Sequence, residues 1–150
     1  MNTMFAIIHK VHSDWTFFVL FILVIAILNS FVGRLKGREF RAKDLRISLF
    51  ALVFSHIQLL IGLIIYFVSP WYDKWDSLGI MNVMKDAKIR FYLVEHPIIN
   101  IIAIVLITMG WSIHKRQNLS SKKFLRIGLF YTLGLFLFLT RIPWNSWIKI

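Results

Sequence analysis

The chain has no cysteine among its 150 residues and carries few acidic groups. The absence of cysteine excludes disulfides, thiolate metal sites and covalent attachment of a haem through a Cys-x-x-Cys-His motif. Only 17% of the residues are charged whereas 58% are hydrophobic, which is too apolar for an ordinary soluble domain. Because the chain is also too short for several domains, we expect residues 1–150 to form a single helical domain in a membrane.

The sequence also lacks the short motifs that mark common catalytic sites. It contains no nucleophile elbow, no phosphate-binding glycine loop, no zinc-protease helix and no paired catalytic carboxylates. We therefore predict that the protein is not an enzyme. In a soluble protein, a net charge of +11 would suggest a nucleic-acid partner. Here the charges gather in short segments between apolar stretches, so we expect contact with the lipid bilayer and none with nucleic acid.

Four apolar stretches are long enough to cross a bilayer as helices. The predicted spans cover about residues 15–33, 47–69, 90–113 and 126–143. The first helix could extend outward through residues 9–14, and Pro97 lies in the first turn or at a kink of the third helix. Residues 71–88 form the only sizeable loop, in which we expect a short amphipathic surface helix over about residues 81–88.

The basic residues predict how these spans are oriented. Eleven of the eighteen Lys and Arg residues follow the first and third spans: Arg34, Lys36, Arg38, Arg41, Lys43 and Arg46, then Lys115, Arg116, Lys122, Lys123 and Arg126. Loops rich in Lys and Arg stay in the cytoplasm, which places both termini outside. Short loops also make adjacent helices antiparallel. The predicted fold class is therefore all-α, an integral membrane four-helix up-down bundle with N-out and C-out termini.

Ionisable residues within or beside apolar spans are the default candidates for a functional site, because they are costly in a bilayer. Four of them stand out: His12, His56, His96 and Arg141. At about 1.5 Å per residue from the cytoplasmic end, His12 lies roughly 31 Å up, His96 about 27 Å, Arg141 about 22 Å and His56 only about 15 Å. In an up-down bundle the first and third helices are diagonal neighbours, so we expect His12 and His96 to face each other.

Each predicted helix carries a stripe of small and polar residues at helical spacing. These stripes are His12, Thr16, Val19, Leu23, Ala26, Ser30 and Gly33 on the first helix; Ser55, Gln58, Gly62, Tyr66 and Ser69 on the second; His96, Asn100, Ala103, Ile107, Gly110 and His114 on the third; and Tyr131, Gly134, Phe138 and Arg141 on the fourth. Such stripes face protein rather than lipid, because small residues allow close approach and polar groups need internal partners. They also leave room for a flat cofactor.

A b-type haem requires two imidazoles that face each other across a bundle as iron ligands, and an arginine at the membrane surface as a cation for the propionates. We therefore predict that His12 and His96 ligate the iron of one haem b and that Arg141 lies near its propionates. His56 has no histidine partner at its own depth, so it could support or replace a ligand, line a quinone pocket or take up a proton. We expect His9 and His114 at the membrane interfaces, in contact with water.

Several stretches of the sequence together resemble a known family. They are residues 8–13 (Ile-His-Lys-Val-His-Ser), residues 55–63 in the second span, Glu95-His96-Pro97 at the start of the third, residues 141–144 (Arg-Ile-Pro-Trp) at the end of the fourth, and residues 84–86 and 90–92. With these stretches, nearly the whole chain is similar to the short membrane proteins of Bacteroidota labelled "cytochrome B". The resemblance implies a four-helix protein of the bacterial inner membrane that binds b-type haem. The widely spaced histidine pairs with which larger cytochromes b hold two haems are missing, so we expect no second haem.

Three functions remain open at this point. The first is electron transfer in a respiratory membrane, with one haem exchanging single electrons with quinol or a respiratory membrane complex. The alternative is a cofactor-free structural or assembly subunit of a larger inner-membrane complex. The third is a small proton, metal or solute carrier with a histidine relay, although Ala103 and Ile107 interrupt the polar stripe that it would need.

Overall fold

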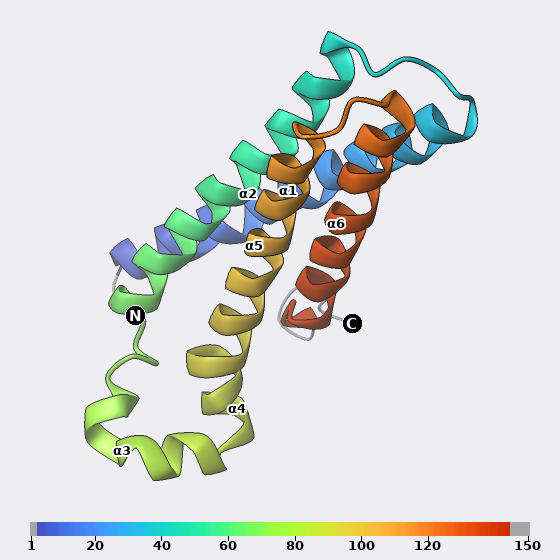
Figure 1. The fold of residues 1–150 in the computed structure, drawn as a ribbon. Helices are drawn as coiled ribbons and strands as arrows, with labels where there is room; N and C mark the ends of the chain where they lie inside the picture. The colour runs from blue at the N-terminus through green and yellow to red at the C-terminus, as the bar shows by residue number, and fades with distance from the viewer. Residues whose placement is uncertain (1–2, 145–150) are drawn as a thin grey trace.

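The computed structural model describes residues 3–144, and within that range the chain is helical and has no strands. The elements are α1 (Thr3–Leu35), α2 (Ala42–Val68), α3 (Lys74–Lys85), α4 (Ala87–Arg90), the π-helical turn η1 (Phe91–Glu95), α5 (His96–His114) and α6 (Ser120–Thr140). Figure 1 shows the long helices side by side, with α3 beyond the end of α2.

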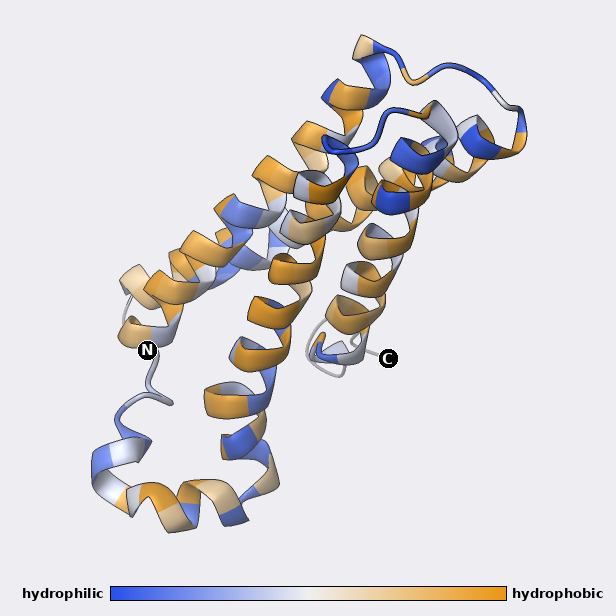
Figure 2. Ribbon diagram, in the orientation of Figure 1, coloured by the Kyte–Doolittle hydropathy of each residue, from blue (hydrophilic) through white to orange (hydrophobic). Residues whose placement is uncertain are grey.

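Four helical segments are long and apolar enough to cross a membrane: Thr3–Leu35, Ala42–Val68, Ala87–His114 and Ser120–Thr140. This finding confirms the prediction of four such helices. Each helix begins before the apolar stretch that predicted it, and the largest extension is that of α1, which starts at Thr3. Figure 2 shows that the long helices are mostly apolar along their length and that polar residues are concentrated in the connections at the basic end.

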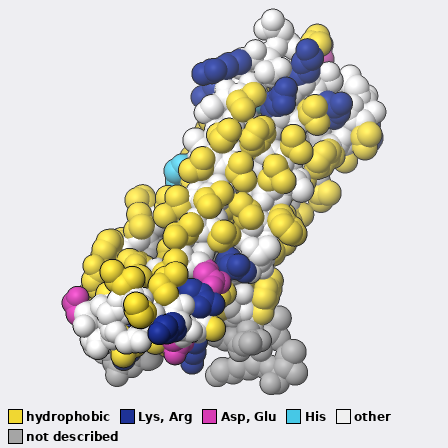
Figure 3. Space-filling model, turned by 60° about the horizontal axis from the view of Figure 1, so that its bottom comes forward, with side chains coloured by type: hydrophobic (Ala, Val, Ile, Leu, Met, Phe, Trp, Pro, Cys, Tyr) yellow, Lys and Arg dark blue, Asp and Glu magenta, His cyan; other side chains and the backbone are white. Residues whose placement is uncertain are grey.

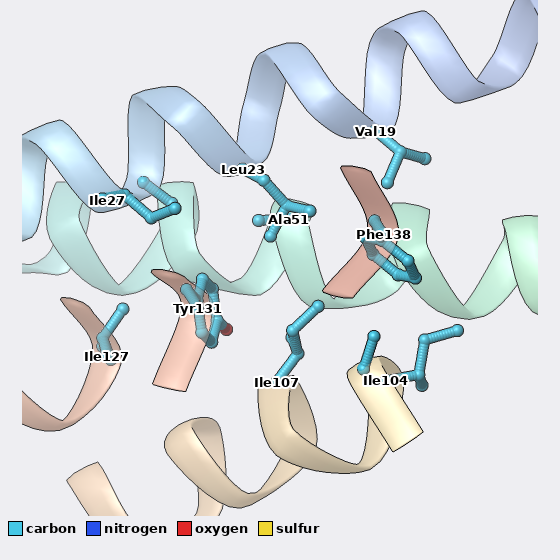
Figure 4. Packing of buried hydrophobic residues seen from close by; sticks show 11 residues of the cluster. Val19, Leu23, Ile27, Ala51, Ile104, Ile107, Ile127, Tyr131 and Phe138 are labelled. Carbon is cyan, nitrogen blue, oxygen red and sulfur yellow. The ribbon is translucent and has the colours of Figure 1, made fainter. Parts of the chain in front are cut away.

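The four long helices pack around one core. α1 contacts α2 and α6, and α5 contacts the same two helices, so α1 and α5 lie diagonally across the bundle. Side chains from all four helices meet in this core (Figure 4), and they include Leu23, Ala51, Ile107 and Tyr131. The Tyr131 hydroxyl donates a hydrogen bond of 2.9 Å to the Ser48 carbonyl, which ties α6 to α2.

The predicted small and polar stripes face this core. On α1 the buried members are Val19, Leu23, Ala26, Ser30 and Gly33; on α5 they are Ala103, Ile107, Gly110 and His114; on α6 they are Tyr131, Gly134 and Phe138. The stripe prediction is therefore confirmed on these three helices. Close helix packing at small residues is the physical reason, because a glycine lets the neighbouring helix approach its backbone.

The two basic segments, residues 36–41 and 115–119, lie at the same end of the bundle as the start of α6. The Phe40 amide donates to Ser120 Oγ at 3.0 Å, and Arg34 donates to the Ser121 carbonyl at 3.2 Å. In the space-filling view of Figure 3, Lys and Arg lie at both ends of the molecule and hydrophobic side chains cover the middle, while most of the visible Asp and Glu side chains lie at only one of the ends.

The loop helix differs from the prediction in its bounds. We expected a helix over about residues 81–88, whereas α3 covers Lys74–Lys85 and a new helix begins at Ala87. Asp86 explains why the helix breaks before Ala87, because its carboxylate caps α4 by accepting hydrogen bonds from the amides of Lys88 and Ile89. Val83 of α3 and Ile89 then share a small second core with Leu93.

Pro97 lies at the junction where the π-helical turn gives way to α5. Proline has no amide hydrogen to donate, and within a regular helix its ring clashes with the carbonyl four residues earlier. The chain meets this constraint with the η1 turn, in which the His96 amide bonds to the Phe91 carbonyl five residues before it. Pro97 thus lies in the first turn of α5, one of the two predicted places, and a π turn directly precedes His96. Such turns are frequent at functional sites.

Candidate functional site

His12 of α1 and His96 of α5 lie opposite each other near the end of the bundle that is remote from the basic segments. Their ring centroids are 6.3 Å apart and the ring planes are inclined by 64°. Both residues are half-buried. The structure therefore brings together two histidines that are far apart in the sequence and that were predicted to face each other.

A backbone carbonyl orients the His96 ring. The Nδ1–H group of His96 donates a 2.6 Å hydrogen bond to the Arg141 carbonyl, just beyond α6. A carbonyl can only accept, so this bond places the proton on Nδ1 and leaves the Nε2 lone pair free. Histidines that bind metals are commonly oriented in this way through their second nitrogen.

The backbone beside His12 is held by a glutamine of α2. Gln58 Nε2 donates to the His12 carbonyl at 3.0 Å and to Thr16 Oγ1 at 2.5 Å, and it lies 3.4 Å from His12 Nε2. His12 Nδ1 and Gln58 Oε1 are buried without a hydrogen-bond partner among the described residues. Buried polar atoms in native proteins nearly always have a partner, so these two atoms are open to a further hydrogen-bonding group.

A glycine leaves room beside the His12 ring. A Cβ atom at Gly62 would lie 3.3 Å from His12 Cε1, closer than ordinary van der Waals contact. Gly62 is one helical turn from Gln58, so a single face of α2 both holds the His12 backbone and leaves space for its ring.

The site carries more positive than negative charge on the side of His96. Glu95 accepts a 2.8 Å hydrogen bond from Arg90. Its second oxygen lies 3.7 Å from Arg141 Nε, within ion-pair range but without a hydrogen bond. One carboxylate is thus shared between two guanidinium groups. The remaining positive charge suits an anionic group such as a propionate.

His56 is not part of this cluster. Its Nδ1–H group donates to the Leu52 carbonyl at 2.8 Å, and its Nε2 lies 3.4 Å from Thr108 Oγ1 of α5. Gln58, which contacts His12, is only two residues from His56 in the sequence. Residues two apart on a helix, however, point in directions about 200° apart. His56 therefore faces a groove between α2 and α5.

The remaining two histidines also lie apart from the candidate site. His9 is exposed, as expected. The expectation that His114 contacts water is wrong, because its exposed fraction is 2% and its Nδ1–H group donates to the Trp111 carbonyl. The cause is the segment after α1, which folds over the end of α5 and places the Phe40 ring 5.6 Å from the imidazole.

The His12 and His96 geometry can be compared with what one metal ion requires. Two imidazole nitrogens, each about 2.0 Å from the same metal, put the ring centroids roughly 6 Å apart. The observed 6.3 Å fits that arrangement. Within residues 3–144 there is no group of three or more His, Asp or Glu side chains that could hold a metal ion. The two rings are thus close enough for one metal ion, and the described residues supply no third side-chain ligand beside them.

Sequence reasoning placed Gln58 and Gly62 on a polar stripe but did not connect them with His12. Their spacing of four residues was the available signal, since it puts both on the same face of α2. Sequence reasoning also missed Asp44, which is fully buried beneath the basic segment. The Arg41 and Asp44 spacing was the signal there, because the residue three positions after an N-cap can accept a hydrogen bond from the N-cap amide.

No protein-family model matches this chain, and comparison with curated proteins and with solved structures also found no match. The function therefore has to be inferred from the residues of this chain.

Proposed function

We propose that the protein is a b-type haem-binding membrane protein of electron transfer in a bacterial inner membrane. His12 and His96 would ligate the iron of a single haem, and Arg141 would lie near its propionates. The observation that carries the proposal is the pair of imidazoles, which face each other at 6.3 Å from helices on opposite corners of the bundle. The haem, when bound, supplies a one-electron couple that exchanges electrons with quinol or a respiratory membrane complex.

The surrounding residues have distinct roles in this proposal. The Arg141 carbonyl accepts the hydrogen bond of His96 Nδ1–H, which leaves Nε2 as the nitrogen that would bind the iron, and Gln58 holds the α1 backbone at His12. Arg90 and Arg141 share the carboxylate of Glu95, which leaves positive charge for the propionates. His56 has no ligand role in this proposal, because it faces the groove between α2 and α5 and not the His12 and His96 pair.

The proposed topology is an up-down bundle with both termini on the outer side. It rests on the eleven basic residues in and beside the segments after α1 and α5 and on the contacts between those two segments. Positively charged loops stay in the cytoplasm, so the haem site lies in the outer half of the membrane.

An absorption spectrum of the purified full-length protein, expressed with adequate haem supply, tests the proposal. The oxidised and dithionite-reduced spectra should show a sharp reduced α band. That band should disappear in His12→Ala and in His96→Ala and should persist in the matched control His56→Ala. Restoration of the band in His96→Gly by added imidazole would separate the loss of a ligand from the loss of the fold.

A colourless but folded protein would overturn the haem proposal. The second candidate is then a cofactor-free structural or assembly subunit of a larger inner-membrane complex. One observation favours it, since the hydrogen bonds of Gln58 and His96 join α1 to α2 and α5 to the end of α6 without any cofactor. Co-purification of a defined membrane complex with the colourless protein would support that alternative.

A further inference from the structure

A second candidate site lies at the opposite end of the bundle, where α2 begins and α5 ends. A pocket of about 340 Å³ opens there, and three of the residues that line it are cationic: Arg41, Lys115 and Lys123. Phe40 and Leu45 supply apolar wall. The cations come from three different segments of the chain, so the fold gathers their charge around one hollow.

An apolar groove of about 420 Å³ lies on the seam between α2 and α5. Its walls include Leu59 of α2 and Ile101, Val105, Met109 and Ile113 of α5, and His56 lies at its edge. Of the four neighbouring pairs of long helices, α2 and α5 contact each other least. The groove follows from this loose packing.

The pocket and the groove lie along the same seam. Leu45 lines the pocket and His56 lines the groove. They are eleven residues apart on α2, so their directions around the helix axis differ by only about 20°. Lys115 of the pocket and Thr108 of the groove are seven residues apart and also differ by about 20° around α5. No residue lines both hollows, but neighbouring residues at the end of α5 line them in turn: Ile113 and Arg116 line the groove, and His114 and Lys115 line the pocket.

The cations of the pocket are only weakly neutralised by the groups around them. Lys115 lies over the Trp111 ring at 4.8 Å and Lys123 over the Phe40 ring at 5.9 Å. Arg41 has one ion pair, with Glu39 at 3.7 Å, and both side chains are exposed. The other acid of this segment, Asp44, is bonded to Arg38 and Asn29. An anion at the pocket would therefore meet a clear excess of positive charge.

We propose that this seam binds one anionic phospholipid, with the phosphate against Arg41, Lys115 and Lys123 and one acyl chain along the groove. The charge of the pocket fits a phosphodiester, and basic pockets between membrane helices are known to hold such headgroups. From Arg116 to Ile101 the groove is about 22 Å long, whereas one leaflet of hydrocarbon is about 15 Å deep. One acyl chain therefore fits along it. This site does not depend on the haem proposal.

Binding can be measured on the delipidated full-length protein in neutral detergent by native mass spectrometry. Titration with phosphatidylglycerol should show one saturable site, and phosphatidylcholine with the same acyl chains should bind much more weakly. Each cation near a lipid headgroup contributes about fivefold in affinity. The variant Arg41→Gln/Lys115→Gln/Lys123→Gln should therefore weaken phosphatidylglycerol binding by roughly 100-fold.

Two matched controls separate a built site from general attraction. The variant Lys36→Gln/Lys43→Gln/Lys122→Gln removes the same charge from exposed residues of the same region that do not line the pocket, and it should leave the affinity nearly unchanged. Val105→Phe fills the groove and should weaken binding, whereas Val24→Phe on α1 should not, because Val24 is a similarly exposed valine outside the groove.

Several outcomes would overturn the proposal. If the two triple variants lost the same affinity for phosphatidylglycerol, binding would depend on overall charge and not on the pocket. Equal affinities for phosphatidylglycerol and phosphatidylcholine would show that the negative charge of the headgroup is not recognised. Displacement of phosphatidylglycerol by inorganic phosphate alone would identify a site for free phosphate instead, and co-purification of only a quinone or a zwitterionic lipid on the seam would identify a different occupant.

Discussion

Asp44 shows at the scale of one residue how the basic end of the bundle is held together. Its carboxylate is fully buried and accepts hydrogen bonds from Arg38 at 2.8 Å, Asn29 at 2.9 Å and the Arg41 amide at 2.9 Å. Arg38 in turn donates to Asn29 Oδ1 at 2.6 Å and stacks over the Phe124 ring. One carboxylate thus joins α1, the following segment and the start of α2.

Replacing Asp44 with alanine should destabilise the protein strongly. The change leaves the Arg38 guanidinium partly buried without its counter-ion, and breaking a buried ion pair in this way costs about 3 kcal/mol or more. Thermal unfolding in detergent, followed by circular dichroism, measures the effect. Glu39→Ala is the control, because its exposed pair with Arg41 should contribute less than about 1 kcal/mol. Equal melting temperatures for the two variants would show that the Asp44 network is not important for stability.

Glycines determine how closely α5 and α6 approach each other. A Cβ atom on Gly134 would lie 2.6 Å from Ile107 Cγ1 and 3.0 Å from the Ala103 carbonyl oxygen. The Ala103 oxygen belongs to the backbone, so it cannot move away by a side-chain rotation as a flexible side chain could. The closest atoms to a Cβ on Gly128, also on α6, would be 3.4 Å away, and all of them belong to the side chains of Ser30 and Phe31.

These distances predict different results for the same substitution at two places on one helix. Gly134→Ala should push α5 and α6 apart and cost about 1–3 kcal/mol, the usual range for overpacking. Gly128→Ala needs only ordinary contact and gains helix propensity, so it should be neutral or slightly stabilising. Unfolding of the two variants in the same detergent compares them directly. If the Gly134→Ala protein were as stable as the Gly128→Ala protein, α5 and α6 would be able to separate at Gly134 without loss of stability.

The elements that could be predicted from the sequence are those that hydrophobic length and period alone determine. Four long helices and the inward faces of α1, α5 and α6 follow from runs of apolar residues with small residues at helical spacing. The C-terminal end of α3 depended on a single carboxylate, that of Asp86, which caps the next helix. The burial of His114 depended on where the Phe40 segment folds, and the contact of Gln58 with His12 depended on the exact rotation of α2 against α1. These features arise from tertiary packing, which local periodicity does not encode.

At the scale of the whole molecule, the two ends of the bundle differ in chemistry. His12 and His96 mark one end, and the cations around the α2 and α5 seam mark the other. From His96 to His114 the chain rises about 27 Å along α5, close to the hydrocarbon thickness of a bilayer. The two proposed sites therefore lie near opposite faces of the membrane, and they can be tested independently.

The orientation of the molecule can be tested with single cysteines, because the chain has none of its own. We expect Ser77→Cys and Lys85→Cys, both at exposed positions of α3, to react with a membrane-impermeant maleimide added to intact spheroplasts. Lys36→Cys and Lys122→Cys, exposed at the basic end, should react only after the membrane is permeabilised, because positively charged segments remain in the cytoplasm. Labelling of Lys36→Cys and Lys122→Cys before permeabilisation would reverse the orientation and would move the histidine pair to the cytoplasmic side.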